Sequence, residues 1–514
     1  MTTSVPTAEP YYLLLMRQWL KGLALLVAIT CLVWVGVLWY WQATSRDMSP
    51  EDIVLYLGLL PLVVFGLVLL ARWALRAAVA SAVAQEAAAA AQAAATASPA
   101  PSSAGQQERH AAFKLLAAGL SCAAGQSARE VAGALAEGAP RPAPDKVLRD
   151  DEGLPVLCAR IEALDTAALQ QAWEGVCTAA KADLQMAETA QVAVDDAVQR
   201  ALSALQAPLQ QCLAQLAAWS ERFAMPDAEA PQAATSALPA GLRVFTAWPS
   251  HWSPIERAVA QAWVKHCLKQ ESAEWLAPSQ LRLMPSTAGG GIALWLEADR
   301  ALRASQREGL PEVVLLLSCQ SDLSDARLSQ LQREASLFTH ASPKAGVAAE
   351  SAVALALADE TWPDLPDAPA TPMRLHRAAV IQRDKPIEAA GRVSAQVAEQ
   401  VVQQAAAAAE LPLSEVSALI SDADQHSPRG AELFSVLVAQ LPQLDAAEDT
   451  LVAGALWGRT GPTAPLMLVA LAAHRAEMNQ QPCLALSVDD SVARMALVLR
   501  PPAAADAEPT KSTS

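Results

Sequence analysis

The sequence has few aromatic residues, which make up 5% of its 514 positions, and alanine and leucine dominate its apolar content. Strands favour aromatic and β-branched residues, so this composition disfavours an all-β protein. The eight cysteines occur singly, with no CxxC pair and no Cys/His spacing of a zinc site. We expect buried, reduced thiols in a cytoplasmic protein that has no metal and no cofactor.

Basic residues are also scarce: 37 Lys and Arg stand against 53 Asp and Glu, a formal charge of −16. Residues 1–80 hold five basic and four acidic side chains, so the acidic excess lies in the remainder of the chain. An acidic body repels a phosphate backbone, and the sequence has no local basic cluster that would offset this. Nucleic acid is therefore excluded as a partner.

Apolar residues are abundant, at 53% with a mean hydropathy of +0.21, which indicates that part of the chain lies in lipid. Two runs carry no charge: 24 residues separate Lys21 from Arg46, and 19 separate Asp52 from Arg72. Each run can cross a hydrocarbon core of about 30 Å as a helix. We expect transmembrane helices at about 23–41 and 53–71.

The flanking charges predict the orientation of this two-helix hairpin. Basic residues precede the first run and follow the second, whereas the connecting segment 42–52 holds one Arg among three acids. By the positive-inside rule, both termini face the cytoplasm. A cleaved signal peptide is the alternative, but the first run is too long and no small-residue cleavage site precedes the second. With no charge inside either run, the hairpin is predicted to be an anchor.

The remainder of the chain divides by composition. Residues 1–76 form the hairpin, 77–108 an Ala/Pro/Ser-rich stalk and linker, 109–235 a first part of the soluble body that contains a long helical stretch, 236–500 an α/β remainder and 501–514 a disordered tail. Short apolar runs, expected as strands, alternate with helical segments such as Glu256–Leu268 and Gly291–Ser305. The runs include Leu154–Ile161, Leu242–Ala247, Val313–Ser318 and Arg377–Ile381. This alternation predicts a layered α/β fold.

Three segments resemble the thiolase and β-ketoacyl synthase family, in the family's order. Phe113–Gly125 with Ser127–Gly138 is similar to the first strand and helix. Gly289–Ser305, Val313–Ser318 and Leu337–Ala358 are similar to the segment before the midpoint, and Val416–Leu499 is similar to the second half. The resemblance implies a thiolase-like layered domain (αβαβα), to which the helical stretch Thr166–Phe223 is an addition.

The same resemblance implies where catalytic residues would lie. Enzymes of the family place a cysteine nucleophile at the N-terminus of a central helix and use two basic side chains from the second half. The matching stretch Pro285–Gly291 contains no cysteine, which leaves the hydroxyls of Ser286 and Thr287. His426 matches the first basic position, and the second, a histidine in the family, falls at Arg459. An arginine cannot shuttle a proton at neutral pH.

These positions, with the triple glycine, imply a vestigial pocket whose members are Thr287, Gly289, Gly290, Gly291, His426 and Arg459. Each has a plainer interpretation as well. The glycines either cradle an anion or permit close packing, and packing is favoured because no Lys follows them. For His426 the plainer interpretation, a satisfied surface or turn histidine, is favoured. Cys319, the first thiol after the stretch Pro285–Gly291, is interpreted as buried at a strand end rather than as a nucleophile.

Loss of the nucleophile and of one base implies a catalytically degenerate body. An N-terminal anchor before such a body also resembles the lipase adapter proteins of bacterial type VI secretion systems. The sequence thus predicts a non-enzymatic adaptor or assembly factor of the bacterial inner membrane. Its partner would be a secretion effector or a component of the secretion apparatus, and a homodimer stays open. The alternative is an acyl-transferring or acyl-binding enzyme that uses Cys319 or Ser286 as nucleophile and His426 as base.

Overall fold

The computed structural model describes Trp34, Trp39 and residues 112–138, 141–187, 189–190, 192–224, 241–272, 276, 280–284, 290–309, 312–362, 372–389 and 394–501. The chain forms two compact units, 1–102 and 103–514, and all described elements lie in the second. The expected spans at 23–41 and 53–71, the stalk 77–108 and most of the tail lie outside the described residues. Among the described residues, no helix has both the length and the apolar character needed to cross a membrane.

The strands of the second unit join in one mixed sheet, whose main path runs in the order β11-β10-β12-β13-β8-β1-β7-β6-β4-β5. The strands are β1 (Ala112–Cys122), β2 (Ala143–Arg149), β3 (Pro155–Ala159), β4 (Leu242–Ala247), β5 (Leu281–Leu283), β6 (Val313–Ser321), β7 (Ala348–Asp359), β8 (Met373–His376), β9 (Ala379–Gln382), β10 (Ala418–Ser421), β11 (Thr450–Val452), β12 (Cys483–Ser487) and β13 (Ala493–Arg500).

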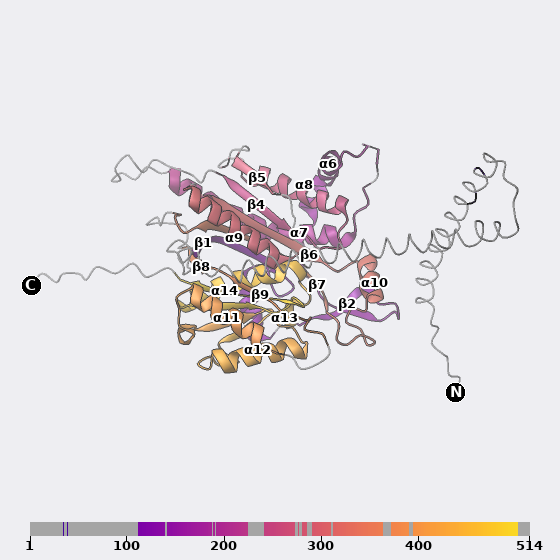
Figure 1. Cartoon of the computed structure of the whole chain (residues 1–514). Helices are drawn as coiled ribbons and strands as arrows, with labels where there is room; N and C mark the ends of the chain where they lie inside the picture. The colour runs from indigo at the N-terminus through magenta and orange to yellow at the C-terminus, as the bar shows by residue number, and fades with distance from the viewer. Residues whose placement is uncertain are drawn as a thin grey trace, which may run out of the picture. The chain divides into compact units, whose positions relative to one another are not determined.

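Helices connect these strands and cover both faces of the sheet (Figure 1). They are α5 (Ala128–Glu137), α6 (Ala167–Asp183), α7 (Asp196–Ala224), α8 (Pro254–Glu271), α9 (Gly291–Glu308), α10 (Asp325–Arg333), α11 (Gln396–Ala408), α12 (Ser427–Gln440), α13 (Gly454–Trp457) and α14 (Ala464–Asn479), with short 3₁₀ turns at Leu413–Glu415 (η4) and Gly461–Thr463 (η5).

Local sequence signals explain where several helices begin and end. The Ser253 side chain accepts from the backbone N–H of Glu256, whose carboxylate accepts from the Ser253 N–H in return, and Pro254 occupies the first turn of α8. Helix α9 ends at Gly309, which adopts a left-handed conformation with φ 66°. Ser253 therefore fixes the start of α8, and Gly309 fixes the end of α9.

Alternate residues along one strand show how the layers are built. On β6, Val314 and Leu316 pack into a core with α9 and α14, whereas Leu315 and Leu317 pack into a second core with α7 and α8. All nine residues of β6 are buried. A strand that is buried on both faces carries a continuous apolar run rather than an alternating one.

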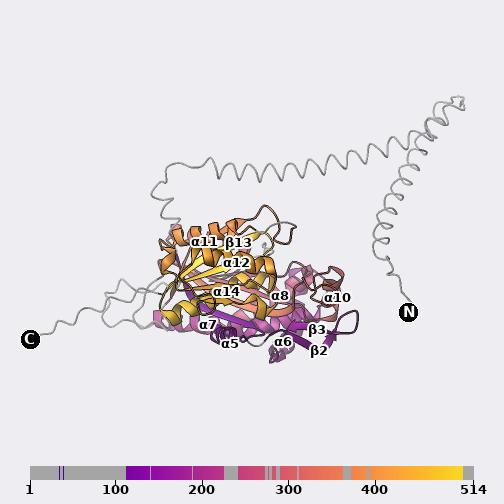
Figure 2. The ribbon, with the colours of Figure 1, turned by 90° about the horizontal axis from the view of Figure 1, so that it is seen from below.

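The second half of the sheet is covered in the same manner. On β13, Leu497 belongs to the core with α14, whereas Ala496 and Val498 pack against α11 and α12 in a third core. Helices α11 and α12 thus lie on the side of the unit opposite to α6, as both views show (Figures 1 and 2). The order of layers is helices, the first half of the sheet, central helices, the second half of the sheet, helices, which is the αβαβα order that the resemblance implies.

One arrangement occurs twice along the chain. Strand β4 is parallel to β5 and β6, and β6 is antiparallel to β7. Strand β10 is likewise parallel to β11 and β12, and β12 is antiparallel to β13. Helices α8 and α12 follow the two equivalent first strands, and α9 and α14 form the central layer. Strand β8 pairs with β1 and with β13, and so joins the halves.

The structure corrects several expected elements. The helical stretch Thr166–Phe223 is two helices, α6 and α7, because Leu184 ends the first one and the second begins only at Asp196. The run Arg377–Ile381, expected as one strand, falls across the break between β8 and β9. The hairpin of β2 and β3 pairs through β3 with β7. Of that hairpin, only the β3 region was expected as a strand.

Candidate functional site

A cavity of about 520 Å³ lies at the carboxyl ends of strands from both halves of the sheet, among residues 249–251 after β4, Asp322 after β6 and Asp489 after β12. The N-terminus of α9, with Gly290 and Gly291, completes it on one side. Ligands in open α/β sheets bind outside the carboxyl ends of the strands, so the position of the cavity makes it the candidate site.

The two central helices meet at this cavity. A Cβ atom on Gly291 would lie 2.2 Å from the Pro462 carbonyl oxygen and 3.1 Å from Pro465 Cδ, so only glycine permits this approach. No neighbouring atom lies within 4 Å of the position that a Cβ would take on Gly290. The glycine at 291 therefore serves the close packing that the sequence analysis favours, and it brings the start of α9 against η5, just before α14.

One wall of the cavity carries two arginines on a single buried carboxylate. Arg327 Nε lies 3.0 Å from Asp322 Oδ1, and Arg459 Nε lies 3.4 Å from Asp322 Oδ2. Arg459 comes from the loop between α13 and η5, where its backbone N–H donates to the Val347 carbonyl oxygen and its own carbonyl oxygen accepts from the Gln320 amide. Two guanidinium groups and one carboxylate leave this wall with a net positive charge.

His251 lines the same cavity, four positions after the end of β4. Burial lowers the pKa of His251 to about 4, and the nearby positive charge of Arg327 acts in the same direction. The ring is therefore neutral at physiological pH. It has no hydrogen-bond partner among the described residues.

The opposite wall is acidic. The buried Asp422 carboxylate, just after β10, accepts hydrogen bonds from Ser487 Oγ at 2.6 Å and from the Val488 N–H at 2.6 Å. Burial raises the pKa of Asp422 above its usual value. Asp489 lines the cavity, and burial together with the negative charge of Asp422 raises its pKa to about 7. A carboxyl group on this wall is thus partly protonated at neutral pH.

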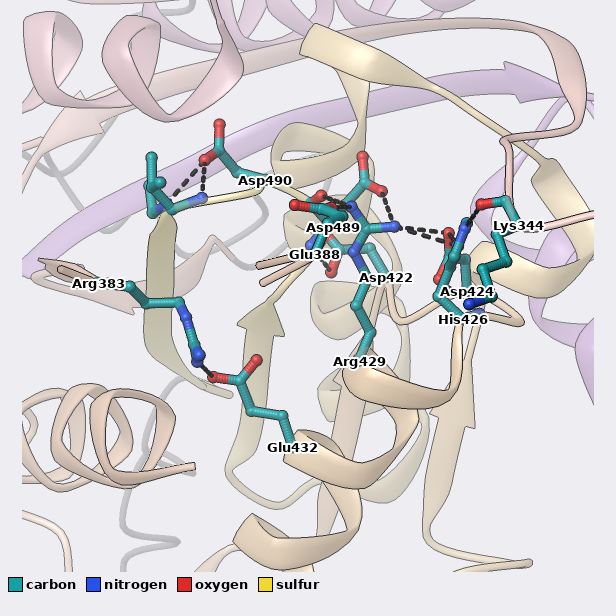
Figure 3. Close-up of polar contacts among 12 residues, drawn as sticks. Lys344, Arg383, Glu388, Asp422, Asp424, His426, Arg429, Glu432, Asp489 and Asp490 are labelled. Atoms are coloured by element: carbon teal, nitrogen blue, oxygen red, sulfur yellow. Dashed lines mark hydrogen bonds and ion pairs between the residues drawn. The ribbon is translucent and has the colours of Figure 1, made fainter. Parts of the chain in front are cut away.

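Arg429 of α12 holds the acidic residues together (Figure 3). It donates to Asp424 Oδ2 at 2.7 Å, to Glu388 Oε1 at 3.1 Å and to the Asp489 carbonyl oxygen at 2.6 Å. Burial lowers the pKa of Arg429, but the carboxylates around it outweigh that effect and raise the pKa above its ordinary value. The guanidinium therefore stays charged and fixes the loop that carries Asp489.

His426 is held from both sides at the start of α12. Its Nδ1 lies 2.6 Å from Asp424 Oδ2, and its Nε2 contacts the Lys344 carbonyl oxygen (Figure 3). Both of these partners are acceptors, whereas a third, Arg429 Nη1, is a donor and lies 3.4 Å from Nδ1. A ring held in this way has no free nitrogen with which to take a proton from a substrate. His426 is not among the residues that line the cavity.

The thiols lie away from the cavity. Cys319 is 0% exposed and packs in the core between the first half of the sheet and helices α7 and α8. Burial raises its pKa, which keeps it a neutral thiol. The other described cysteines are buried or half-buried and free of disulfides, and no described cysteine lines the cavity.

The structure brings together some of the residues that the sequence places in a vestigial pocket. Gly290, Gly291 and Arg459 line one cavity. Ser286, Thr287 and Gly289 lie outside the described residues. In the described part of the chain, no group of three His, Cys, Asp or Glu side chains is placed to hold a metal ion.

Sequence reasoning missed His251, Asp322, Arg327 and Asp489. One signal could have pointed to the first of these. His251 is followed by Trp-Ser-Pro at the start of α8, and His426 by Ser-Pro at the start of α12. The two histidines hold matching places after the equivalent strands β4 and β10. A search for internal repeats would therefore have paired them.

No protein-family model matches this chain, and no curated protein matches its sequence. Several of the solved structures that resemble it are ketosynthases. The ishigamide ketosynthase/chain length factor is 16% identical, with 76% of this chain and 99% of that chain covered and a TM-score of 0.45. The oxazolomycin ketosynthase domain from Streptomyces albus is 12% identical, with 76% and 74% covered and a TM-score of 0.46.

A type II polyketide synthase acyl-carrier protein in complex with its ketosynthase is a further similar structure. It is 11% identical, with 76% of this chain and 100% of that chain covered and a TM-score of 0.48. At such identities the likeness concerns the fold alone, and no residue role is transferred from these proteins.

Proposed function

We propose that this chain is a non-enzymatic adaptor or assembly factor, in which an N-terminal hairpin anchors a catalytically degenerate thiolase-like body at the bacterial inner membrane. The observation that supports this most directly is the position of Cys319. The first thiol after the expected nucleophile stretch is fully buried in a core away from the cavity. A thiolate attacks only where it is accessible and its pKa is low, and neither condition holds here.

The basic positions give further support. The ring nitrogens of His426 are both taken, by Asp424 and by the Lys344 carbonyl. Arg459 carries its charge beside Asp322 and does not exchange protons at neutral pH. Condensation of acyl groups needs a nucleophile and a base that can release and accept protons. The described part of the cavity supplies no thiol and no histidine from the second half of the chain.

The anchor determines where such a body would act. A hairpin with both ends in the cytoplasm, followed by the linker 77–108, confines the body to the inner face of the membrane. Confinement raises its effective concentration for partners at that face without any new contact. Its partner would be a protein, and the resemblance to secretion adapters makes an effector or a secretion-apparatus component the first to test.

An acyl-transferring or acyl-binding enzyme is the second candidate, favoured by one observation. The cavity holds a neutral imidazole, His251, in the same space as the N-terminus of α9. Neutral histidine is the usual general base, and the N-terminal end of a helix stabilises negative charge. On this reading Ser286, just before α9, would be the nucleophile.

Mass spectrometry of the detergent-solubilised full-length chain separates the two. The protein is purified from its host and analysed for stoichiometric companions, then analysed again after exposure to acyl-CoA. We expect a protein companion and no acyl adduct. An adduct on Ser286 or Cys319 would favour the enzyme and overturn the adaptor.

Two substitutions sharpen this test. Cys319→Ala and His426→Ala are expected to leave partner capture intact, provided that the variants keep the wild-type unfolding midpoint. Loss of function in a stably folded His426→Ala variant, with unchanged partner binding, would contradict the proposal that the thiolase-like body is catalytically inactive. Arg459→Ala serves as a third variant, at a residue that lines the cavity, unlike the other two.

A further inference from the structure

The arginine wall of the cavity has N–H donors with no hydrogen-bond partner in the described part of the chain. Asp322 is almost fully buried and receives Arg327 Nε at 3.0 Å, whereas the two contacts from Arg459 are long, at 3.4 and 3.5 Å. A guanidinium group offers five N–H donors in a planar fork. Within the described residues, the terminal nitrogens of Arg327 and one of those of Arg459 have no hydrogen-bond partner.

These arginines line the cavity rather than the outer surface. The side chain of Arg327 is 11% exposed and that of Arg459 is 27% exposed, and both border the 520 Å³ space. A partly buried guanidinium group interacts more strongly with an anion than one in bulk water does, because the local dielectric constant is lower. The body around this wall is acidic, with a chain charge of −16, so the positive charge here is a local feature.

His251 adds a third group to the same wall. It lies close enough to Asp322, Arg327 and Arg459 for their charges to act on it. Its ring is neutral, so it offers one N–H donor without adding charge. The backbone at Gly290 and Gly291, at the start of the 18-residue helix α9, faces the same space.

We infer that this wall binds an oxyanion, the carboxylate or phosphate group of a small molecule, through Arg327, Arg459 and His251. Arginine forks match the oxygen spacing of both groups, which is why they share this chemistry. The proposal concerns a ligand and does not depend on the adaptor function.

The opposite wall limits the remainder of the ligand. The Asp490 carboxylate there already accepts from the backbone N–H groups of Val492 and Ala493, at 2.8 Å each. Asp489 has a raised pKa and resists a further negative charge nearby. A ligand with one anionic end and a far end that carries hydroxyl or amine donors fits both walls, whereas a dianion with charges at both ends does not.

Isothermal titration calorimetry on the detergent-solubilised full-length chain tests this. The probes are 4-hydroxybutyrate, its neutral amide, succinate and inorganic phosphate. We expect saturable binding of 4-hydroxybutyrate or of phosphate, and the tighter of the two identifies the group that the wall prefers. The amide is expected to bind about tenfold more weakly because it lacks the charge that the guanidinium groups pair with, and succinate about tenfold more weakly because its second carboxylate meets the acidic wall.

Substitutions locate the site. Arg459→Gln and Arg327→Gln should each weaken binding about tenfold or more. The matched control is Arg243→Gln, since Arg243 forms a comparable half-buried ion pair with Glu312 away from the cavity. Should the loss of an Asp322 partner unfold a variant, His251→Gln tests the same site without touching that ion pair. Unchanged binding in His251→Gln and Arg459→Gln, equal binding of the amide, or no saturable binding of either anion would overturn the proposal.

Discussion

A Cβ atom on Gly291 would lie 2.2 Å from the carbonyl oxygen of Pro462. This approach joins the start of α9 to η5 at the centre of the fold, where Gly291 is buried. Since Pro462 contributes backbone rather than a movable side chain, Gly291→Ala should force the two central helices apart. We expect the free energy of unfolding to fall by about 1–3 kcal/mol, the usual cost of overpacking. Denaturant unfolding of the full-length chain measures it.

Gly290→Ala is the matched control. Gly290 adopts extended backbone with φ −160°, and no atom lies within 4 Å of its ideal Cβ. Its substitution should change stability by no more than about 0.5 kcal/mol. An equal loss in both variants would show that the contact with Pro462 is not what requires glycine at 291.

Much of the fold could be predicted because buried strands carry continuous apolar runs. The expected strand Leu242–Ala247 has the bounds of β4, and Val313–Ser318 falls within β6. A helix whose sequence is mostly polar could not be predicted from apolar residues in this way. Helix α10 is rich in polar residues and buries only Leu328 and Leu331, so its sequence has little helical periodicity to detect.

The break in Thr166–Phe223 shows a second limit. Apolar spacing continues through this stretch, but the chain stops being helical at Leu184 and resumes at Asp196. The separate helices α6 and α7 then pack in the same outer core, together with α8. Tertiary packing therefore decides this boundary, and a periodicity within one segment does not reveal it.

The site was only partly predictable, for a related reason. Gly290, Gly291 and Arg459 could be placed by resemblance, but the partners of Arg459 could not. Asp322 and Arg327 reach it from another part of the chain, and the positive wall exists only after folding. The absence of a basic cluster in the sequence thus did not exclude a local basic wall.

Asp489→Asn should change how stability depends on pH. The pKa of this carboxyl rises from 3.8 to about 7 on folding. Between those values the unfolded chain releases the proton while the folded chain keeps it, so rising pH favours unfolding. Relative to the variant, the wild type should lose on the order of a few kcal/mol as pH increases from about 4 to 7. Urea titrations at several pH values measure the difference, and parallel pH profiles would contradict it.

His251→Gln should give the opposite slope. The pKa of His251 falls from 6.5 to about 4 on folding. Between these pH values the imidazole therefore binds a proton in the unfolded chain but not in the folded chain. The wild type should therefore lose stability relative to this variant as pH decreases from 6.5 to 4. The two effects oppose each other in the wild type, and a double variant should show a flatter profile than either single one.

Glu432 and Arg494 form a fully buried ion pair behind the acidic wall, with Nε and Oε2 2.9 Å apart. Arg383 donates to the other oxygen of Glu432 at 2.8 Å (Figure 3). Glu432→Gln leaves two guanidinium groups without their counter-charge, and we expect a loss of about 3–5 kcal/mol in the free energy of unfolding. Glu388→Gln, which removes an exposed partner of Arg429, is the control and should cost no more than about 1 kcal/mol.

The same substitution should also disturb the cavity. Arg494 donates to the Asp490 carbonyl oxygen. The Asp490 carboxylate in turn accepts from the backbone N–H groups of Val492 and Ala493. Asp490, Val492 and Ala493 line the cavity together with Asp489. Hydrogen exchange at Val492 and Ala493 should therefore accelerate in Glu432→Gln and not in Glu388→Gln. Equal exchange in the two variants would mean that the buried pair supports α12 alone and does not position the acidic wall.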